Sequence, residues 1–274
     1  TDHAAALFAL AEPGNIYTRI MNPTTAVFEE RIAALEGGIG ALATASGQFA
    51  ETLAILTIAN AGDEIISTSA LYGGSYTLLS QSLRRLGITT HFVQGTDPAD
   101  FEKLINEKTR AIYLETLGNP KLEIPDFEGI TALARSYGIP VILDNTFATP
   151  YLFQPFKWGV NISLHSTTKW IGGHGLSIGG VLIDGGNFDW KASNRHPGIV
   201  EPEPAYHGAV LADVLGAAAF IGRARVVGLR DFGGSQSPFN SFLNIIGLET
   251  LALRVQRHVA NAQAVAEYLE QHPS

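Results

Sequence analysis

Short aliphatic runs that each end in a polar side chain recur along this chain of 274 residues, and they limit its fold more than any other feature. The clearest run is Val141-Ile142-Leu143-Asp144, which stops on a carboxylate. Buried parallel strands consist of such runs, and polar groups at their carboxyl ends often face a ligand. Helix-like segments separate the runs as far as Ile183, so we predict an α/β chain with a mainly parallel sheet covered by helices on both faces. The runs lie at residues 41–45, 64–68, 111–116, 141–144 and 162–168.

The handedness of the connections predicts where the polar residues at the strand ends meet. Crossovers between parallel strands are right-handed, which places all the carboxyl ends on one edge of the sheet. We therefore expect one site at that edge. Its members are the residues that follow the strands, namely Ser46, Tyr72, Asn119, Asp144 and Lys169.

The stretch from Ile162 to Lys169 alternates like a strand, ends in hydroxyls and a lysine, and precedes a glycine-rich segment. A lysine becomes a nucleophile when desolvation or a neighbouring cation lowers its pKa. Asp144 could keep a protonated pyridine nitrogen cationic, while Ser166 and Thr168 could hold a phosphate. Taken singly, a structural aspartate and a solvated lysine are the commoner situations. The combination favours a functional site.

A second phosphate contact is predicted at Ser46-Gly47-Gln48, where a strand turns into a helix expected over residues 49–59. The free N–H groups and the positive end of a helix favour an anion, and Gly47 lets it approach. A plain serine N-cap explains the same residues about as well. The nearby G-x-G-x-x-A match at residues 38–43 is not a dinucleotide site, because its glycines end a helix and lead into a strand.

The flanking segments predict further local structure. Residues 14–24 have turn formers at both ends and no helical period, which indicates an extended arm. The following helix is expected to be capped by Thr24 or Thr25 and to end at Gly37. Its expected apolar face consists of Val27, Phe28, Ile32 and Leu35. Further helices are expected at residues 3–10, 101–105 and 237–272. The first begins so close to Thr1 that we expect more chain upstream.

The composition excludes several classes of function. A formal net charge of −8 offers no basic surface for nucleic acid or anionic lipid. The absence of cysteine excludes disulfides and thiolate metal sites, and no metal is expected. Because no apolar run approaches the roughly 18 residues of a membrane span, we expect a soluble, cytoplasmic enzyme whose partners are small molecules and other subunits.

Two motifs carry a resemblance to a known family. Residues 144–151 (DNTFATPY) and 165–175 (HSTTKWIGGHG) resemble the cysteine and methionine metabolism family of pyridoxal-phosphate (PLP) enzymes. The resemblance extends from about Gly14 to the last residue. It implies a fold-type I PLP-dependent transferase in which Lys169 anchors the cofactor and Asp144 contacts the ring nitrogen. It assigns the cofactor phosphate to Ser46, Gly47, Gln48, Ser166 and Thr168.

The same resemblance implies roles for four more residues. Tyr72 would stack on the pyridine ring and assist proton transfer, and Asn119 would hydrogen-bond the ring oxygen. Tyr17 and Arg19 would reach across a subunit interface to the phosphate of a neighbour. A homodimer that pairs into a homotetramer is therefore expected.

The resemblance also predicts the domain organisation. Residues 1–22 correspond to the intersubunit arm, 23–245 to the large PLP-binding domain, and 246–274 to the start of a smaller C-terminal domain. That domain supplies the arginine for the substrate α-carboxylate in the family, and no residue here corresponds to it. We expect a chain of this extent to hold cofactor but to bind substrate poorly.

Residues 186–190 and 201–208 resemble the sulfhydrylase branch, and the lyase branches lack this insertion. The implied reaction converts O-acetyl-L-homoserine and sulfide into L-homocysteine and acetate, with methanethiol as another acceptor that would give methionine. His207 in this insertion is either a substrate contact or a loop residue. Cystathionine γ-synthase, a γ-lyase and a catalytically silent assembly chain remain alternatives. A nicotinamide oxidoreductase and a hydrolase have weaker support, since G-x-S-x-G and H-E-x-x-H are absent.

Overall fold

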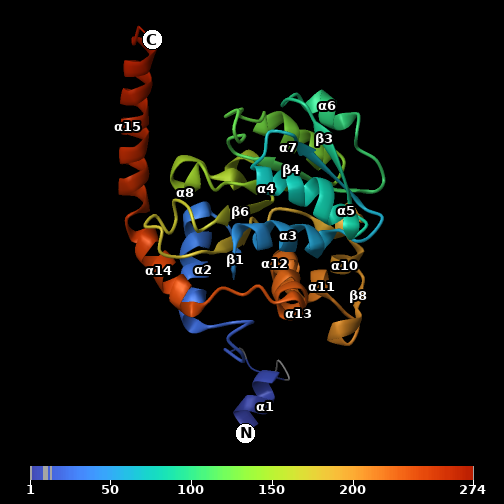
Figure 1. The fold of residues 1–274 in the computed structure, drawn as a ribbon. Helices are drawn as coiled ribbons and strands as arrows, with labels where there is room; N and C mark the ends of the chain where they lie inside the picture. Colours follow the sequence, from blue (N-terminus) through green and yellow to red (C-terminus); the bar gives the residue numbers. More distant parts are fainter. Residues whose placement is uncertain (1, 9–11, 13, 274) are drawn as a thin grey trace.

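The computed structural model describes residues 2–8, 12 and 14–273. Its centre is a seven-stranded sheet with the order β1-β7-β6-β5-β4-β2-β3 (Figure 1). The strands are β1 (Gly40–Thr44), β2 (Glu64–Thr68), β3 (Thr89–Val93), β4 (Thr109–Glu115), β5 (Val141–Asp144), β6 (Ile162–Ser166) and β7 (Gly180–Asp184). A separate two-stranded sheet pairs β8 (Pro202–Glu203) with β9 (Ala209–Val210).

The predicted parallel sheet is confirmed. Strands β3, β2, β4, β5 and β6 pair in parallel, and only β7 runs antiparallel to both of its neighbours. The edge strand β3 was not predicted, because its half-exposed sequence Thr89-Thr90-His91-Phe92-Val93 lacks an aliphatic run. The alternating stretch at residues 162–169 is a strand only as far as Ser166, after which the chain turns.

Helices cover both faces of the sheet, as Figure 1 shows. The first half of the chain contributes α1 (Asp2–Phe8), α2 (Pro23–Glu36), α3 (Gly47–Ile58), α4 (Gly73–Thr77), α5 (Leu83–Arg85), α6 (Pro98–Glu102) and α7 (Phe127–Ser136). The second half contributes α8 (Thr149–Leu152), α9 (Trp190–Ser193), α10 (Pro197–Val200), α11 (Leu211–Leu215), α12 (Ala219–Arg223), α13 (Arg230–Phe232), α14 (Pro238–Glu249) and α15 (Leu251–Glu270). A π-helical turn at Leu78–Ser82 joins α4 to α5, and another at Ala224–Leu229 joins α12 to α13.

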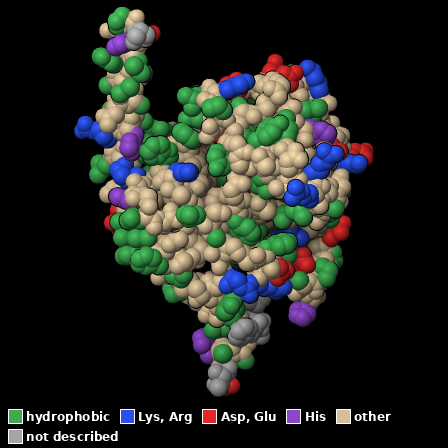
Figure 2. Space-filling view, in the orientation of Figure 1, with side chains coloured by type: hydrophobic (Ala, Val, Ile, Leu, Met, Phe, Trp, Pro, Cys, Tyr) green, Lys and Arg blue, Asp and Glu red, His purple; other side chains and the backbone are tan. Residues whose placement is uncertain are grey.

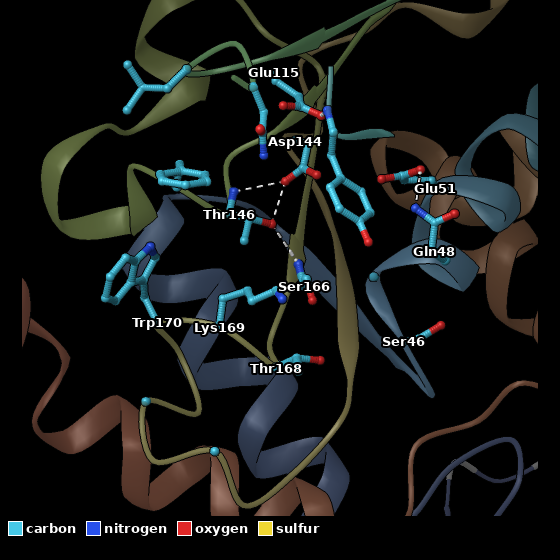
Figure 3. Close-up of a pocket in the computed structure, with 17 residues that line it drawn as sticks. Ser46, Gln48, Glu51, Glu115, Asp144, Thr146, Ser166, Thr168, Lys169 and Trp170 are labelled. Carbon is cyan, nitrogen blue, oxygen red and sulfur yellow. Dashed lines mark hydrogen bonds between the residues drawn. The ribbon is translucent and has the colours of Figure 1, made fainter. Parts of the chain in front are cut away.

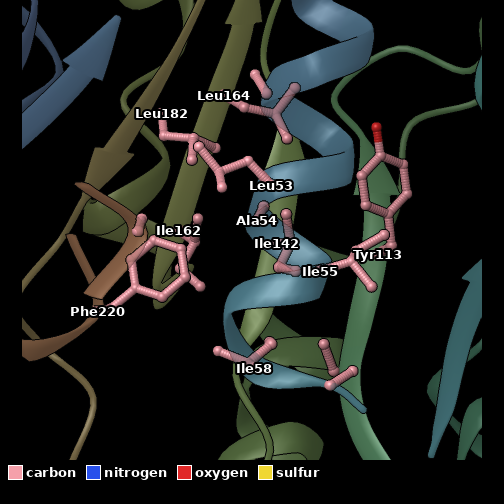
Figure 4. Close-up of a cluster of buried hydrophobic side chains, with 14 of the residues drawn as sticks. Leu53, Ala54, Ile55, Ile58, Tyr113, Ile142, Ile162, Leu164, Leu182 and Phe220 are labelled. Atoms are coloured by element: carbon pink, nitrogen blue, oxygen red, sulfur yellow. The ribbon is translucent and has the colours of Figure 1, made fainter. Parts of the chain in front are cut away.

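Helix α3 fills the centre of one face. Its buried side chains, Leu53 among them, pack on alternate residues of the central strands, and Phe220 closes the cluster from α12 (Figure 4). The intervening strand residues point to the opposite face, where α7 and α2 cover them. Each fully buried leucine or isoleucine stabilises the fold by roughly 1.5–3 kcal/mol. This packing fixes the start of α3 against the carboxyl edge of the sheet.

Several predicted helix boundaries were wrong. Helix α2 is capped by Asn22, whose side chain accepts the N–H of Thr24, because Pro23 suits the first position of a helix. On its predicted apolar face Phe28 and Ile32 are buried, but Val27 and Leu35 are 42% and 43% exposed.

Two other predicted helices are shifted. The short helix expected at residues 101–105 is α6, which begins at Pro98 after the Asp97 cap. The helix expected at residues 3–10 is α1, and residues 9 and 10 lie outside the described residues.

The expected helical region at the end of the chain consists of α14 and α15, with a break at Thr250. Figure 1 shows α15 projecting away from the sheet, and Figure 2 shows apolar side chains along it. Leu253 and Tyr268 are among the exposed ones. Among the described residues, no helix combines the length and apolarity needed to cross a membrane. The proposed domain boundary after residue 245 falls within α14 and stays a prediction.

Candidate active site

A cavity of about 630 Å³ opens at the carboxyl edge of the sheet, which is a size typical of small-molecule sites (Figure 3). All the predicted site residues except Tyr17 and Arg19 line it, and the expected meeting of the strand ends is confirmed. The lining consists of Ser46, Gly47, Gln48, Glu51, Tyr72, Glu115, Leu117, Asn119, Asp144, Thr146, Phe147, Ser166, Thr168, Lys169, Trp170, Gly173 and Gly175.

Asp144 ends β5 at the inner wall of the cavity. Its Oδ1 accepts the N–H of Thr146 at 2.9 Å and the hydroxyl of Thr146 at 2.5 Å. Burial raises the pKa of this carboxyl, while the hydrogen bonds from Thr146 and the nearby His165 lower it. A buried carboxylate held in this way stabilises a cationic N–H group that enters the cavity.

Thr146 connects the two strand ends that form the site. Its hydroxyl donates to Asp144 and accepts the N–H of Ser166 at 2.8 Å, as the dashed lines in Figure 3 show. The orientation of the carboxylate is therefore coupled to the β6 turn. Thr146 was not assigned a role from sequence, although its position two residues after a strand-end aspartate is typical of a side chain-to-backbone turn.

A buried polar network between α2 and the ends of β5 and β6 also holds these strand ends in place. Glu36, the last residue of α2, accepts hydrogen bonds from Ser163, His165 and Asn145 at 2.8, 2.5 and 3.1 Å. His165 and Asn145 are direct chain neighbours of Ser166 and Asp144. Because a buried carboxylate needs several donors, this network fixes β5 and β6 relative to each other.

The start of α3 forms the second wall. Ser46 is the N-cap, and its Oγ accepts the N–H of Phe49 at 3.1 Å. The serine-cap interpretation is therefore confirmed, and the N–H groups of Gly47 and Gln48 remain as donors for an anion. Gly47 lies so close to β6 that an added Cβ would be 2.6 Å from the Ser166 Cβ. This approach brings Ser166 next to the helix end.

Lys169 and Thr168 follow Ser166 in the turn after β6. Lys169 is exposed and extends within the cavity on the side of Ser166 (Figure 3). The Thr168 Oγ1 accepts the N–H of Gly179 at 3.1 Å and lies 3.2 Å from the Gly179 oxygen, to which it donates. Thr168 thus lines the cavity while its hydroxyl also fixes the turn.

Two carboxyls in the cavity wall were missed from sequence. The Glu115 Oε1 accepts the N–H of Tyr72 at 2.7 Å, and the Glu51 Oε1 accepts the hydroxyl of Ser75 at 2.7 Å. Burial, together with the neighbouring Asp144, raises the pKa of Glu51 to about 8 and that of Glu115 to about 9. Two signals were available in the sequence. Glu115 ends the β4 run, and Glu51 lies one helical turn after Gln48.

Tyr17 and Arg19 do not reach the cavity of their own chain. Tyr17 is 53% exposed, and the Arg19 Nη1 donates to the carbonyl oxygen of Arg230. Their action on a neighbouring subunit stays a prediction. His207 lies in the loop before β9, outside the cavity lining.

The chain is similar to known proteins over its whole length. The family model described as Cys/Met metabolism PLP-dependent enzyme matches residues 1–274. The O-acetyl-L-homoserine sulfhydrylase of Leptospira meyeri is 53% identical over 281 residues, covering 100% of this chain and 63% of the relative. The homocysteine/cysteine synthase of Kluyveromyces lactis is 55% identical over 273 residues, covering 99% of this chain and 62% of the relative.

A solved structure from Campylobacter jejuni, named as an O-acetylhomoserine (thiol)-lyase, has a TM-score of 0.95 and 41% identity to this chain. The match covers 99% of this chain and 68% of that one. It contains N'-pyridoxyl-lysine-5'-monophosphate, a lysine joined to the cofactor. The present chain spans less than two thirds of the length of the two curated relatives.

Proposed function

Because this chain belongs to the Cys/Met metabolism PLP-dependent enzymes, we propose that it is the PLP-binding part of a transferase that replaces the acetate of O-acetyl-L-homoserine by sulfide. The Cγ–O bond of the substrate breaks and a Cγ–S bond forms, so that O-acetyl-L-homoserine and hydrogen sulfide give L-homocysteine and acetic acid. Methanethiol in place of sulfide gives methionine. Relatives at 53% and 55% identity with sulfhydrylase and synthase names support this reaction.

The observation that carries this proposal is that Lys169 and the half-buried Asp144 line the same cavity. The cavity residues fit PLP by their chemistry. The N–H groups of Gly47 and Gln48 and the hydroxyl of Ser166 are donors for a phosphate, while the Asp144 carboxylate is an acceptor for a pyridine N–H.

When bound, PLP supplies an electron sink for the electron pair released at the substrate α carbon. The residues of the chain do the rest. Lys169 would hold the cofactor through its Nζ, and its amine would move protons at the α and β carbons of the substrate. Asp144 would keep the ring nitrogen protonated, Asn119 would donate to the ring oxygen, and Tyr72 would stack on the ring and assist proton transfer.

A visible spectrum followed by borohydride reduction and peptide mapping tests the cofactor assignment. We expect a yellow protein whose reduced adduct maps to Lys169, and Lys169→Ala should abolish turnover while leaving the fold intact. Lys103→Ala, which alters an exposed lysine on the surface near α6, serves as the control. An adduct on another lysine, or wild-type turnover by Lys169→Ala, contradicts the assignment.

A substrate panel separates the reaction from its relatives. O-acetyl- and O-succinyl-L-homoserine are each supplied with sulfide, methanethiol, cysteine or no nucleophile. Homocysteine formation with sulfide and the acetyl donor is the expected result. Preferred use of cysteine indicates cystathionine γ-synthase, and release of a keto acid without a nucleophile indicates a γ-lyase.

The proposed assembly is a homodimer, or a pair of dimers, with Tyr17 and Arg19 acting in the partner's site. Support comes from the exposure of Tyr17 and from the position of Arg19 outside its own cavity. Mixing Lys169→Ala with Arg19→Ala subunits should restore part of the activity, because a hybrid dimer contains one complete site. Absence of recovery in confirmed hybrids contradicts action in trans.

A cytoplasmic location stays a prediction.

A further inference from the structure

Tyr72 stands immediately before α4, and its N–H donates to the Glu115 carboxyl at the end of β4. We propose that Glu115 is a positioning residue, which holds the main chain of Tyr72 so that the Tyr72 ring faces the cofactor end of the cavity. This inference rests on the proposed PLP site. It assigns a purpose to a carboxyl that touches neither the predicted phosphate contacts nor Lys169.

The position of Glu115 is set by the sheet. Glu115 ends β4 directly opposite Asp144 in the parallel register of β4 and β5, so the two side chains share one face of the sheet (Figure 3). Glu115 is only 6% exposed. A side chain fixed by two paired strands provides a more rigid anchor than a loop residue does.

The loop before Tyr72 packs closely on the segment after β4. An added Cβ at Gly118 would lie 2.9 Å from the Ala70 Cβ and 3.1 Å from the Ala70 oxygen. The two segments therefore leave no room for a side chain between them. The hydrogen bond from the Tyr72 N–H to Glu115 adds a polar contact next to this close packing.

The ring of Tyr72 also needs a defined place, because it is 52% exposed and the core does not hold it. It lies over Gly74, where an added Cβ would be 2.5 Å from the ring Cε1. The main chain is thus held by Glu115, and the ring direction is limited by Gly74. Loss of the Glu115 contact frees the main chain and lets the ring leave the cavity.

A second carboxyl fastens the same short helix. Glu51 on α3 accepts the hydroxyl of the fully buried Ser75, three residues after Tyr72. Helix α4 is too short to be stable alone. Its two attachments, Glu115 and Glu51, therefore determine where it begins.

The charges around Glu115 favour the protonated, neutral form of its carboxyl group. Asp144 on β5 and Glu51 on α3 raise its pKa after burial, and the phenol of Tyr113 lies beside Glu51. Protonation of Glu115 and Glu51 at neutral pH removes two negative charges from the surroundings of Asp144. A protonated carboxyl still accepts the Tyr72 N–H through its carbonyl oxygen.

The test compares variants of the intact protein by their affinity for PLP, measured through tyrosine and tryptophan fluorescence quenching on cofactor addition to the apoenzyme. Glu115→Ala should weaken PLP binding about tenfold, the loss typical of a buried hydrogen bond. Glu115→Gln, which keeps a carbonyl acceptor, should bind within about twofold of wild type. Glu102→Ala, which alters an exposed glutamate at the end of α6, is the matched control.

A double-mutant cycle tests whether Glu115 acts through Tyr72. In a Tyr72→Ala background, Glu115→Ala should cause no further loss, because the ring that it positions is gone. Equal PLP affinity of wild type and Glu115→Ala, or fully additive losses, overturns the proposal. If Glu115→Ala does not fold, the Glu115→Gln variant provides the test. A large loss of PLP affinity in Glu115→Gln overturns the role of Glu115 as acceptor of the Tyr72 N–H.

A wild-type protein that binds no PLP overturns the cofactor assignment and this inference with it. A wild-type protein that binds PLP with no response to Glu115 overturns this inference alone.

Discussion

Replacing Gly47 by alanine is the sharpest steric test of the site. An added Cβ at this position meets the Ser166 Cβ at 2.6 Å, the Ser166 Cα at 2.9 Å and the Ser166 Oγ at 3.1 Å. Two of these atoms belong to the main chain or sit directly on it, so rotation of a side chain does not relieve the clash. The start of α3 and the end of β6 must separate by several tenths of an ångström.

The separation has two consequences of calculable size. Overpacking of a well-packed contact costs about 1–3 kcal/mol of unfolding free energy. Displacing the phosphate donors also weakens PLP binding, by roughly tenfold to a hundredfold, since hydrogen bonds to an anion are worth roughly 1.5–3 kcal/mol each. The loss of PLP affinity should be larger than the loss that the lower unfolding free energy alone would cause, because the clash lies within the site.

Urea unfolding and a PLP titration of the apoenzyme measure both effects. The matched control is Gly40→Ala at the start of β1, where the added Cβ meets only the Ile221 Cγ2 at an ordinary 3.4 Å. The control should be close to wild type in both assays. If Gly47→Ala is as stable as Gly40→Ala and binds PLP equally well, the steric reasoning is wrong.

Further predictions concern charge and packing. The pKa values of about 8 for Glu51 and about 9 for Glu115 lie above the ordinary 4.5, so the folded state keeps protons that the unfolded chain releases. The unfolding free energy should therefore fall as the pH rises from about 4.5 towards 9, by up to about 1.4 kcal/mol per pH unit for each retained proton. Glutamine at either position should flatten that slope in urea unfolding, and an unchanged slope contradicts the assignment. Asp144→Asn should reduce PLP affinity by about a hundredfold or more in equilibrium dialysis, because an ion pair in the buried wall is lost; unchanged affinity contradicts its role. Leu53→Ala should lower the unfolding free energy by about 2–5 kcal/mol without altering the absorption spectrum of bound PLP, and a loss below about 1 kcal/mol would show that α3 does not fill the core as Figure 4 depicts.

The strands and their polar ends were predictable because the signals are local. The aliphatic run before Asp144 and the alternation before Ser166 reflect burial on two faces, and the handedness of crossovers then places their ends on one edge. The helix after Ser46 was expected at residues 49–59, but α3 begins earlier, at Gly47, directly after the Ser46 cap. The family resemblance then supplied roles that residue patterns alone do not contain.

Contacts between segments were decided only by the tertiary structure. Glu115 has no local signal that distinguishes it from any other strand-end glutamate, and its meeting with Asp144 depends on the register of β4 and β5. Its raised pKa depends on burial, on Asp144 at the end of the paired strand, and on Glu51, which approaches from α3. Local sequence determines which residues lie at the ends of strands, whereas the register and packing of distant segments determine which of those residues meet and what charge they carry.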